Sequence, residues 1–209
     1  MTYSVLALDQ SMTSTGFAHY KHGDSTPSWG LKTYPPWEND EGKYLWNFFE
    51  WLGHMCVDLK VTHLFVEDTR FTFKNEPGDG PRKHEETLTQ LVASIGLIQQ
   101  AAIVAYKLGE RGQHIEFQAV SPIDWRRLFL GAMPKPGGIL PQDWRKILKE
   151  AAVSQCHKRG WIIESNDIAD ALGILTFGIC TIDESFRHFQ TPLFNRAEVA
   201  IDNRVRELK

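Results

Sequence analysis

The spacing of apolar and polar residues changes along the chain, and it begins with a pattern typical of short strands. Three β-prone apolar runs cover residues 3–8, 15–20 and 28–34, and polar turn residues such as Gly23 and Asp24 separate them. Short hydrophobic runs joined by such turns are typical of an antiparallel meander. These three runs are therefore predicted to form three neighbouring antiparallel strands.

After residue 40 the apolar residues recur with the period of a helix. Residues 41–59 and 85–108 both carry apolar side chains every three or four positions, which predicts two amphipathic helices. Residues 63–68 and 114–120 are short apolar runs and are predicted to be strands. Ser121 followed by Pro122 is a helix-start signal, and two further helices are predicted over 142–159 and 167–180.

The order of these elements predicts the fold class. Strands that pair as hairpins come first, and strands linked through helices follow, so the fold is expected to be α/β, with a mixed five-stranded sheet flanked by helices. We expect one domain over residues 1–182. The tail over residues 183–209 has no role that its sequence indicates.

Composition excludes several classes of protein. The hydrophobic fraction of 42% is that of a globular chain, and no run of 18 apolar residues predicts a membrane span. The N-terminus lacks the basic and apolar regions of a signal peptide, so a cytoplasmic location is expected. The three cysteines (Cys56, Cys156 and Cys180) form no CxxC pair, and they are expected to be reduced, without a disulfide or a zinc site.

Charge is distributed unevenly along the chain. The net charge is −3, but residues 107–159 carry ten Lys and Arg against five Asp and Glu, a local balance of +5. A basic face on an otherwise acidic protein suits a polyanion such as DNA, although solvated helix faces give the same pattern.

Four carboxylates occupy unusual places in the predicted elements. Asp9 and Glu67 stand at the ends of apolar strands, where an unpaired carboxylate is costly to bury. Asp167 and Asp170 are three residues apart at the start of a helix, so they share one face. A helix N-terminus favours acidic residues by itself. Asp167 therefore has an alternative, purely structural role as an acid that stabilises the start of the helix.

Phosphodiester hydrolysis explains a set of four such acids. Two divalent ions about 4 Å apart activate water and stabilise the leaving oxygen in many nucleases. Mg²⁺ prefers oxygen ligands, which Asp and Glu supply. The four acids are therefore candidate catalytic residues and candidate ligands of two Mg²⁺ ions, with Mn²⁺ as a substitute ion.

Several short motifs resemble the RuvC-type Holliday-junction resolvases of the RNase H-like superfamily. They are Val5-Leu6-Ala7-Leu8-Asp9-x-Ser11 with Thr15-Gly16, then Phe65-Val66-Glu67, Phe71-x-x-Lys74-Asn75 and Asn166-Asp167-Ile168-Ala169-Asp170-Ala171-Leu172. They occur in the family's order and cover most of residues 1–182. The Asp-x-x-Asp-Ala-Leu motif is the most specific of them.

This resemblance implies both an activity and a partner. It implies an endonuclease that resolves four-way junctions or branched DNA, with Asp9, Glu67, Asp167 and Asp170 as Mg²⁺ ligands. It also implies a bacterial or phage-infected host cell. A four-way junction has two-fold symmetry, so a homodimer is expected, and the helix over 85–108 is the candidate interface.

The resemblance also suggests which residues bind DNA. An aromatic residue in the loop after the glutamate acts on bases in this family, and Phe71 or Phe73 occupies that place. Lys74 and the later basic residues are candidate phosphate ligands. These later residues are Arg126, Arg127, Lys135, Arg145 and Lys146.

Three alternatives remain open at this point. An RNase H-like nuclease that cuts flaps or other branched DNA would carry the same four acids. The segment from Asp9 to Gly16 also resembles the phosphate-binding turn of actin-like ATPases, although those normally need a second domain. A non-catalytic DNA-binding protein is disfavoured, because DNA binding alone would not favour acids near phosphates.

Overall fold

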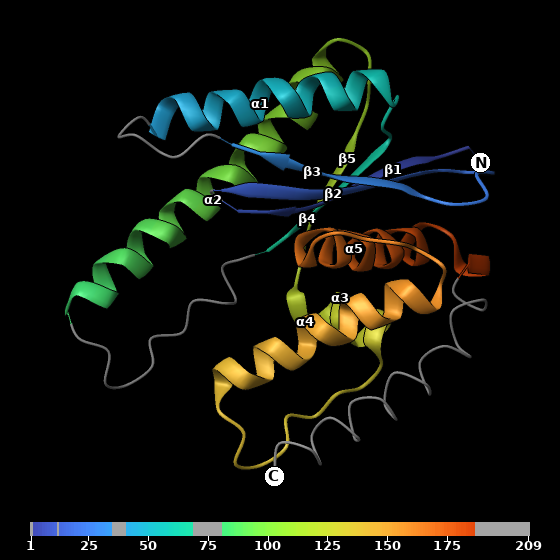
Figure 1. Cartoon of the computed structure of the whole chain (residues 1–209). Coiled ribbons are helices and arrows are strands. Elements are labelled where there is room, and N and C mark those ends of the chain that lie inside the picture. The colour runs from blue at the N-terminus through green and yellow to red at the C-terminus, as the bar shows by residue number, and fades with distance from the viewer. Residues whose placement is uncertain (1, 12, 35–40, 69–80, 187–209) are drawn as a thin grey trace.

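A mixed five-stranded sheet with helices on both faces forms the centre of the protein (Figure 1). The computed structural model describes residues 2–11, 13–34, 41–68 and 81–186. The strands are β1 (Ser4–Gln10), β2 (Ser14–Lys21), β3 (Ser28–Thr33), β4 (His63–Glu67) and β5 (Glu116–Val120). The helices are α1 (Glu41–Asp58), α2 (Pro81–Glu110), α3 (Pro122–Leu130), α4 (Pro141–Lys158) and α5 (Asn166–Ile182).

The strand order in the sheet is β3-β2-β1-β4-β5. The first three strands pair antiparallel, whereas β4 pairs parallel to β1 and β5 pairs parallel to β4. Parallel neighbours need a crossover, and α1 and α2 supply the two crossovers here. The predicted meander, mixed sheet and α/β class are confirmed.

Side chains alternate between the two faces of β1 and β4, and each face has its own core. Leu8 and its partner Val66 belong to the apolar cluster under α1 and α2. Ala7 and its partner Phe65 belong to the cluster under α5. The face on which a strand residue lies therefore tells which helices it can meet.

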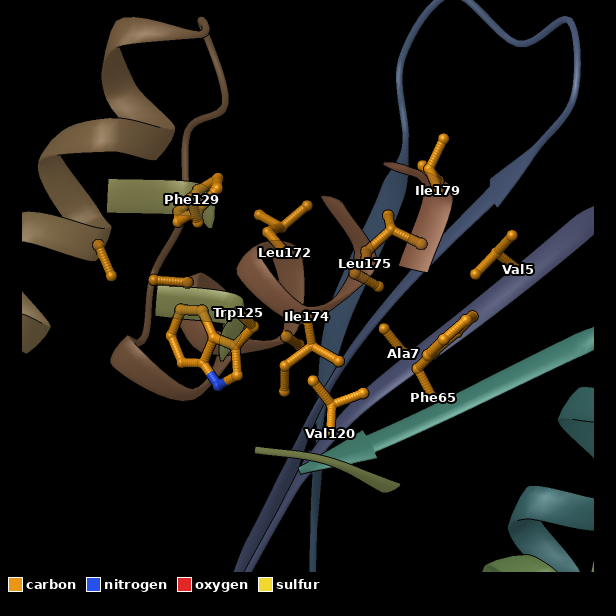
Figure 2. Packing of buried hydrophobic residues seen from close by; sticks show 14 of the residues in the cluster. Val5, Ala7, Phe65, Val120, Trp125, Phe129, Leu172, Ile174, Leu175 and Ile179 are labelled. Carbon is orange, nitrogen blue, oxygen red and sulfur yellow. The ribbon is translucent and has the colours of Figure 1, made fainter. Parts of the chain in front are cut away.

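Helix α5 lies between the sheet and the pair α3 and α4 (Figure 1). From Ile168 to Cys180 all its residues but Phe177 are buried, because it has neighbours on both sides. Figure 2 shows Trp125 and Phe129 of α3 beyond Leu172 of α5, with Phe65 and Val5 of the sheet on the other side.

Capping residues explain where the later helices begin. Ser121 is the N-cap of α3 with Pro122 in its first turn, as predicted, and Ser165 caps α5 through bonds from the backbone N–H groups of Asp167 and Ile168. The helices predicted from 85 and from 142 begin earlier, at Pro81 and Pro141. Proline suits a first helical turn, because the N–H that it lacks has no partner there.

The end of α5 also lies further along than the sequence predicted. The helix ends at Ile182 rather than near 180, and the next residues contact the sheet. The hydroxyl of Tyr3 donates to Asp183 at 3.1 Å, and the rings of Tyr20 and Phe186 lie 6.2 Å apart. Asp183 and Phe186, at the start of the predicted tail, thus contact the domain.

Two expectations about the whole chain can be compared with the structure. Cys56, Cys156 and Cys180 are free and buried. Among the described helices, none has the length and apolar character needed to cross a membrane.

Candidate active site

Asp9 and Glu67 lie side by side on the α5 face of the sheet. They follow the parallel pair Leu8 and Val66 by one residue, so both side chains point away from the α1 and α2 core. Glu67 is buried and Asp9 is partly buried. The side-chain amide of Gln10 donates to the backbone carbonyl of Glu67 at 2.7 Å and links the two strand ends.

The start of α5 reaches the same place because β2 offers a glycine there. Gly16 is the partner of Asp9 in the β1–β2 ladder. A Cβ at Gly16 would stand 2.1 Å from the carbonyl oxygen of Asp167, so only glycine permits this approach. Ser14 on the same strand donates its hydroxyl to the carboxylate of Asp167 at 2.7 Å.

Two of the four carboxylates, Asp9 and Asp170, have raised pKa values. The pKa of Asp9 is raised well above its usual value, first by desolvation and then by the charges of Glu67, Asp170 and Asp167. Burial raises the pKa of Asp170 to about 7, and Glu67 adds to this, whereas Arg126 opposes it. The four acids that the sequence singled out therefore lie together at one end of the sheet.

Arg126 of α3 is the cation within this cluster. Its Nη2 atom lies 3.5 Å from Oε1 of Glu67 and 3.4 Å from Oδ2 of Asp170. Its guanidinium rests over the ring of Trp125, 4.8 Å from the centroid, and the indole N–H of Trp125 donates to Oε1 of Glu67 at 3.0 Å. Together Trp125 and Arg126 orient the glutamate.

The other basic residues that the sequence singled out lie at the surface. Arg127, Lys135, Arg145 and Lys146 are exposed on α3, on the loop before α4 and on α4. Of these later basic candidates, Arg126 is the one whose ion pairs with the carboxylates are observed. Lys149 of α4 is also near, since its charge lowers the pKa of Asp170.

Three predicted DNA-binding residues lie outside the described residues. They are Phe71, Phe73 and Lys74, which follow Glu67 in the chain. Their roles therefore stay predictions.

Trp125, Ser14 and Lys149 are contacts of the site that sequence reasoning did not single out. Trp125 of α3 is fully buried, and the sequence had singled out only the neighbouring Arg126 and Arg127 and the helix start at Ser121 and Pro122 in this segment. Ser14 falls in a polar turn where serine is ordinary. The polar Asp68 beside Glu67 is also buried, at 4% exposure.

Comparisons with known proteins agree with the fold. No family model and no curated protein matches the chain. Among solved structures, RuvC of Thermus thermophilus superposes with a TM-score of 0.53 at 13% identity, over 82% of this chain and 90% of that one. The structure of T. thermophilus RuvC in complex with a Holliday junction substrate superposes with a TM-score of 0.53 at 11% identity, over 83% of this chain and 90% of that one.

The strand order, the helix layers and these superpositions define a RuvC-like RNase H fold. The predicted fold class is confirmed, and the resemblance first seen in four short motifs extends to the three-dimensional arrangement of most of the chain.

Proposed function

We propose that this protein is a Mg²⁺-dependent endonuclease that cuts branched DNA, with four-way junctions as its substrate. The observation that carries the proposal is the meeting of Asp9, Glu67, Asp167 and Asp170 at one end of the sheet. Asp9 and Glu67 follow paired residues of β1 and β4, the start of α5 contacts the Gly16 partner of Asp9, and Arg126 lies within 3.5 Å of both Glu67 and Asp170. The RuvC-like fold and the solved complex of a similar structure with a Holliday junction support the choice of substrate.

The charges of the cluster fit divalent cations. Burial first, and the neighbouring carboxylates after it, raise the pKa of Asp9 and bring that of Asp170 to about 7, and the guanidinium of Arg126 does not offset these two effects. The cluster presents carboxylate oxygens, which are the ligands that Mg²⁺ prefers. The proposed ligands are the four acids, and the bound ions would activate water and stabilise the leaving oxygen.

The arrangement described here would adjust when ions bind. In the described part of the chain no three His, Cys, Asp or Glu side chains already form a ligand cage. Arg126 stands between Glu67 and Asp170, at 3.5 and 3.4 Å. We infer that it swings toward the DNA when cations take its place and there contacts a phosphate, which is the role its charge suits.

A homodimer would match the two-fold symmetry of a junction, and α2 offers a surface for it. Val92, Ile103 and Tyr106 are exposed by 64%, 43% and 66%. Steps of eleven and three residues place them along one stripe of the helix. We propose that this stripe contacts a second copy of the chain.

A cleavage assay with matched variants tests the proposal. A four-way junction, a flap and a linear duplex would be incubated with the full chain in Mg²⁺, in Mn²⁺ and in EDTA, beside Asp9→Asn and Glu50→Gln. Glu50 is an exposed acid on α1, so its variant controls for the loss of one charge.

The expected result is cleavage of the junction in Mg²⁺ or Mn²⁺, none in EDTA, and a loss of at least about 100-fold in Asp9→Asn, a size typical of losing one essential catalytic group. Cleavage that survives EDTA or Asp9→Asn would overturn the metal site. Equal cutting of linear duplex would overturn the structure-specific substrate, and a preference for flaps would point to the other branched-DNA nuclease.

A further inference from the structure

A groove opens beside the candidate active site, between α3, the loop that follows it and α4. It has a volume of about 470 Å³, within the range of about 300–1,000 Å³ that is usual for small-ligand pockets. Its walls are mostly apolar, from Pro122, Ile123, Met133, Pro134, Trp144 and Leu148. A single nucleoside is of a size that such a groove accommodates.

Two arginines line the same groove and give it a polar end. Arg127 is exposed, and Arg126 reaches from the groove to the carboxylates of Glu67 and Asp170. The groove and the cluster therefore share one side chain. A ligand that fits both parts has a flat apolar portion and an anionic portion, which is the chemistry of a nucleotide.

Trp144 supplies an aromatic surface in this groove. It is partly buried, in the first turn of α4, and packs against Ile147, as Met133 also does. An unpaired base stacks on such a ring with little dependence on sequence, and each stacked base contributes about 1–3 kcal/mol of binding. The surrounding prolines and Met133 add apolar contacts.

We propose that this groove holds the base of a DNA nucleotide next to the phosphodiester that the carboxylates cut, with that base stacked on Trp144 and its phosphate near Arg127. The inference rests on the proposed nuclease function and extends it. A base can enter only where the duplex is open, so the groove would favour branched DNA over linear duplex.

A thermodynamic cycle between the tryptophan and the base tests this inference. The cleavage position would first be mapped with the wild-type chain. Dissociation constants would then be measured by fluorescence anisotropy in the Asp9→Asn background, for junctions that carry either the native base or an abasic site at single positions around the cut. The proteins would be the background alone, with Trp144→Leu, with Trp144→Phe and with Trp46→Ala.

The variants separate stacking from folding. Leucine keeps an apolar side chain without an aromatic face, and phenylalanine restores that face. Trp46 is 57% exposed on α1, on the other face of the sheet, and controls for the loss of a surface tryptophan. Thermal unfolding of each variant would show that the fold is kept.

Trp144→Leu and the removal of the base should each weaken DNA binding. At one position around the cut, these two losses of affinity are expected not to add. Trp144→Leu should weaken binding of the intact junction by about 10-fold and hardly change binding of the abasic junction, and Trp144→Phe should recover most of the loss. Trp46→Ala should change neither. Equal weakening of both junctions at every position, or no weakening, would overturn the inference.

The outcome also distinguishes this inference from the proposed function. Cleavage by the wild type without coupling at Trp144 would overturn the groove alone and leave the nuclease standing. A protein that neither cuts nor binds DNA would overturn both. Saturable binding of a free deoxynucleoside monophosphate at micromolar concentration, with no coupling in the junction, would assign the groove to free nucleotide and overturn the DNA assignment.

Discussion

At the scale of single residues, the site holds more negative charge than its surroundings neutralise. Asp170 is 4% exposed, and its nearest cation, Arg126, is shared with Glu67. Burial and the neighbouring glutamate raise its pKa to about 7. Buried charge of this kind lowers the stability of the metal-free protein, and functional sites commonly reduce stability in this way.

Removing this charge should stabilise the metal-free protein. The folded-state pKa of Asp170 is raised from 3.8 to about 7, so wild-type stability falls as the pH rises between those values. In EDTA at pH 8, the free energy of unfolding of Asp170→Asn should therefore exceed that of the wild type by about 1 kcal/mol or more. Urea denaturation from pH 4 to pH 8 measures this difference.

The same variant should lose the response to metal. Mg²⁺ is expected to raise the melting temperature of the wild type, since a ligand that binds only the folded state stabilises it, and to raise that of Asp170→Asn much less. Glu50→Gln serves as the control in both measurements. An Asp170→Asn protein that is less stable than wild type at pH 8 would contradict the charge argument.

At the scale of secondary structure elements, the site depends on how closely α5 approaches the β1–β2 hairpin. Gly16 makes the contact with the first turn of α5, and Gly173 leaves room for Trp125, whose ring atoms would stand 2.5 Å from a Cβ there. Gly16 thus brings the start of α5, with Asp167 and Asp170, close to Asp9, and Gly173 lets α3 pack against α5.

Gly16→Ala should therefore destabilise the fold and disrupt the site together. Its Cβ would overlap the carbonyl oxygen of Asp167 at 2.1 Å, and relieving that overlap requires α5 to move. We expect a loss of about 2 kcal/mol or more in urea denaturation and weakened stabilisation by Mg²⁺.

Gly53→Ala provides the matched control for this prediction. Gly53 lies within α1, and a Cβ there meets no atom within 4 Å. Alanine in a helix interior is more stable than glycine by about 0.5–1 kcal/mol, so this variant should gain stability and keep its response to metal. Equal stability of Gly16→Ala and wild type would show that α5 does not approach as described.

At the scale of the whole molecule, the two faces of the sheet have different tasks in this proposal. Helices α3, α4 and α5 surround the candidate active site and its groove, whereas α1 and α2 cover the opposite face (Figure 1). A dimer contact on α2 would therefore leave the site of each copy accessible to DNA.

Tyr106→Glu should weaken such a dimer. A buried charge at an interface is costly unless it is paired, so we expect the mass in solution to shift toward that of one chain, 23.9 kDa. Sedimentation equilibrium over a range of concentrations measures this. Ile162→Glu, at an 83% exposed apolar residue before α5, is the control. A wild type that remains monomeric at all concentrations would overturn the dimer.

The order of the elements and the type of each could be determined from the sequence, because the hydrophobic period is a local property. The alternation over the first three strands, the helical stripe of α1 and the serine caps of α3 and α5 all act within a few residues. Asp9 and Glu67 could also be chosen from the sequence, since carboxylates at the ends of apolar strands are costly to bury, whereas Asp167 and Asp170 were chosen from their shared helix face and from the resemblance to a known motif.

Only the tertiary structure decided what surrounds those acids. Trp125 and Arg126 are separated from Glu67 by 58 and 59 positions, and no local pattern indicates that the indole and the guanidinium meet its carboxylate. The groove beside Trp144 likewise arises from packing between α3 and α4. Long-range packing set these contacts, and with them the place where a DNA base is proposed to bind.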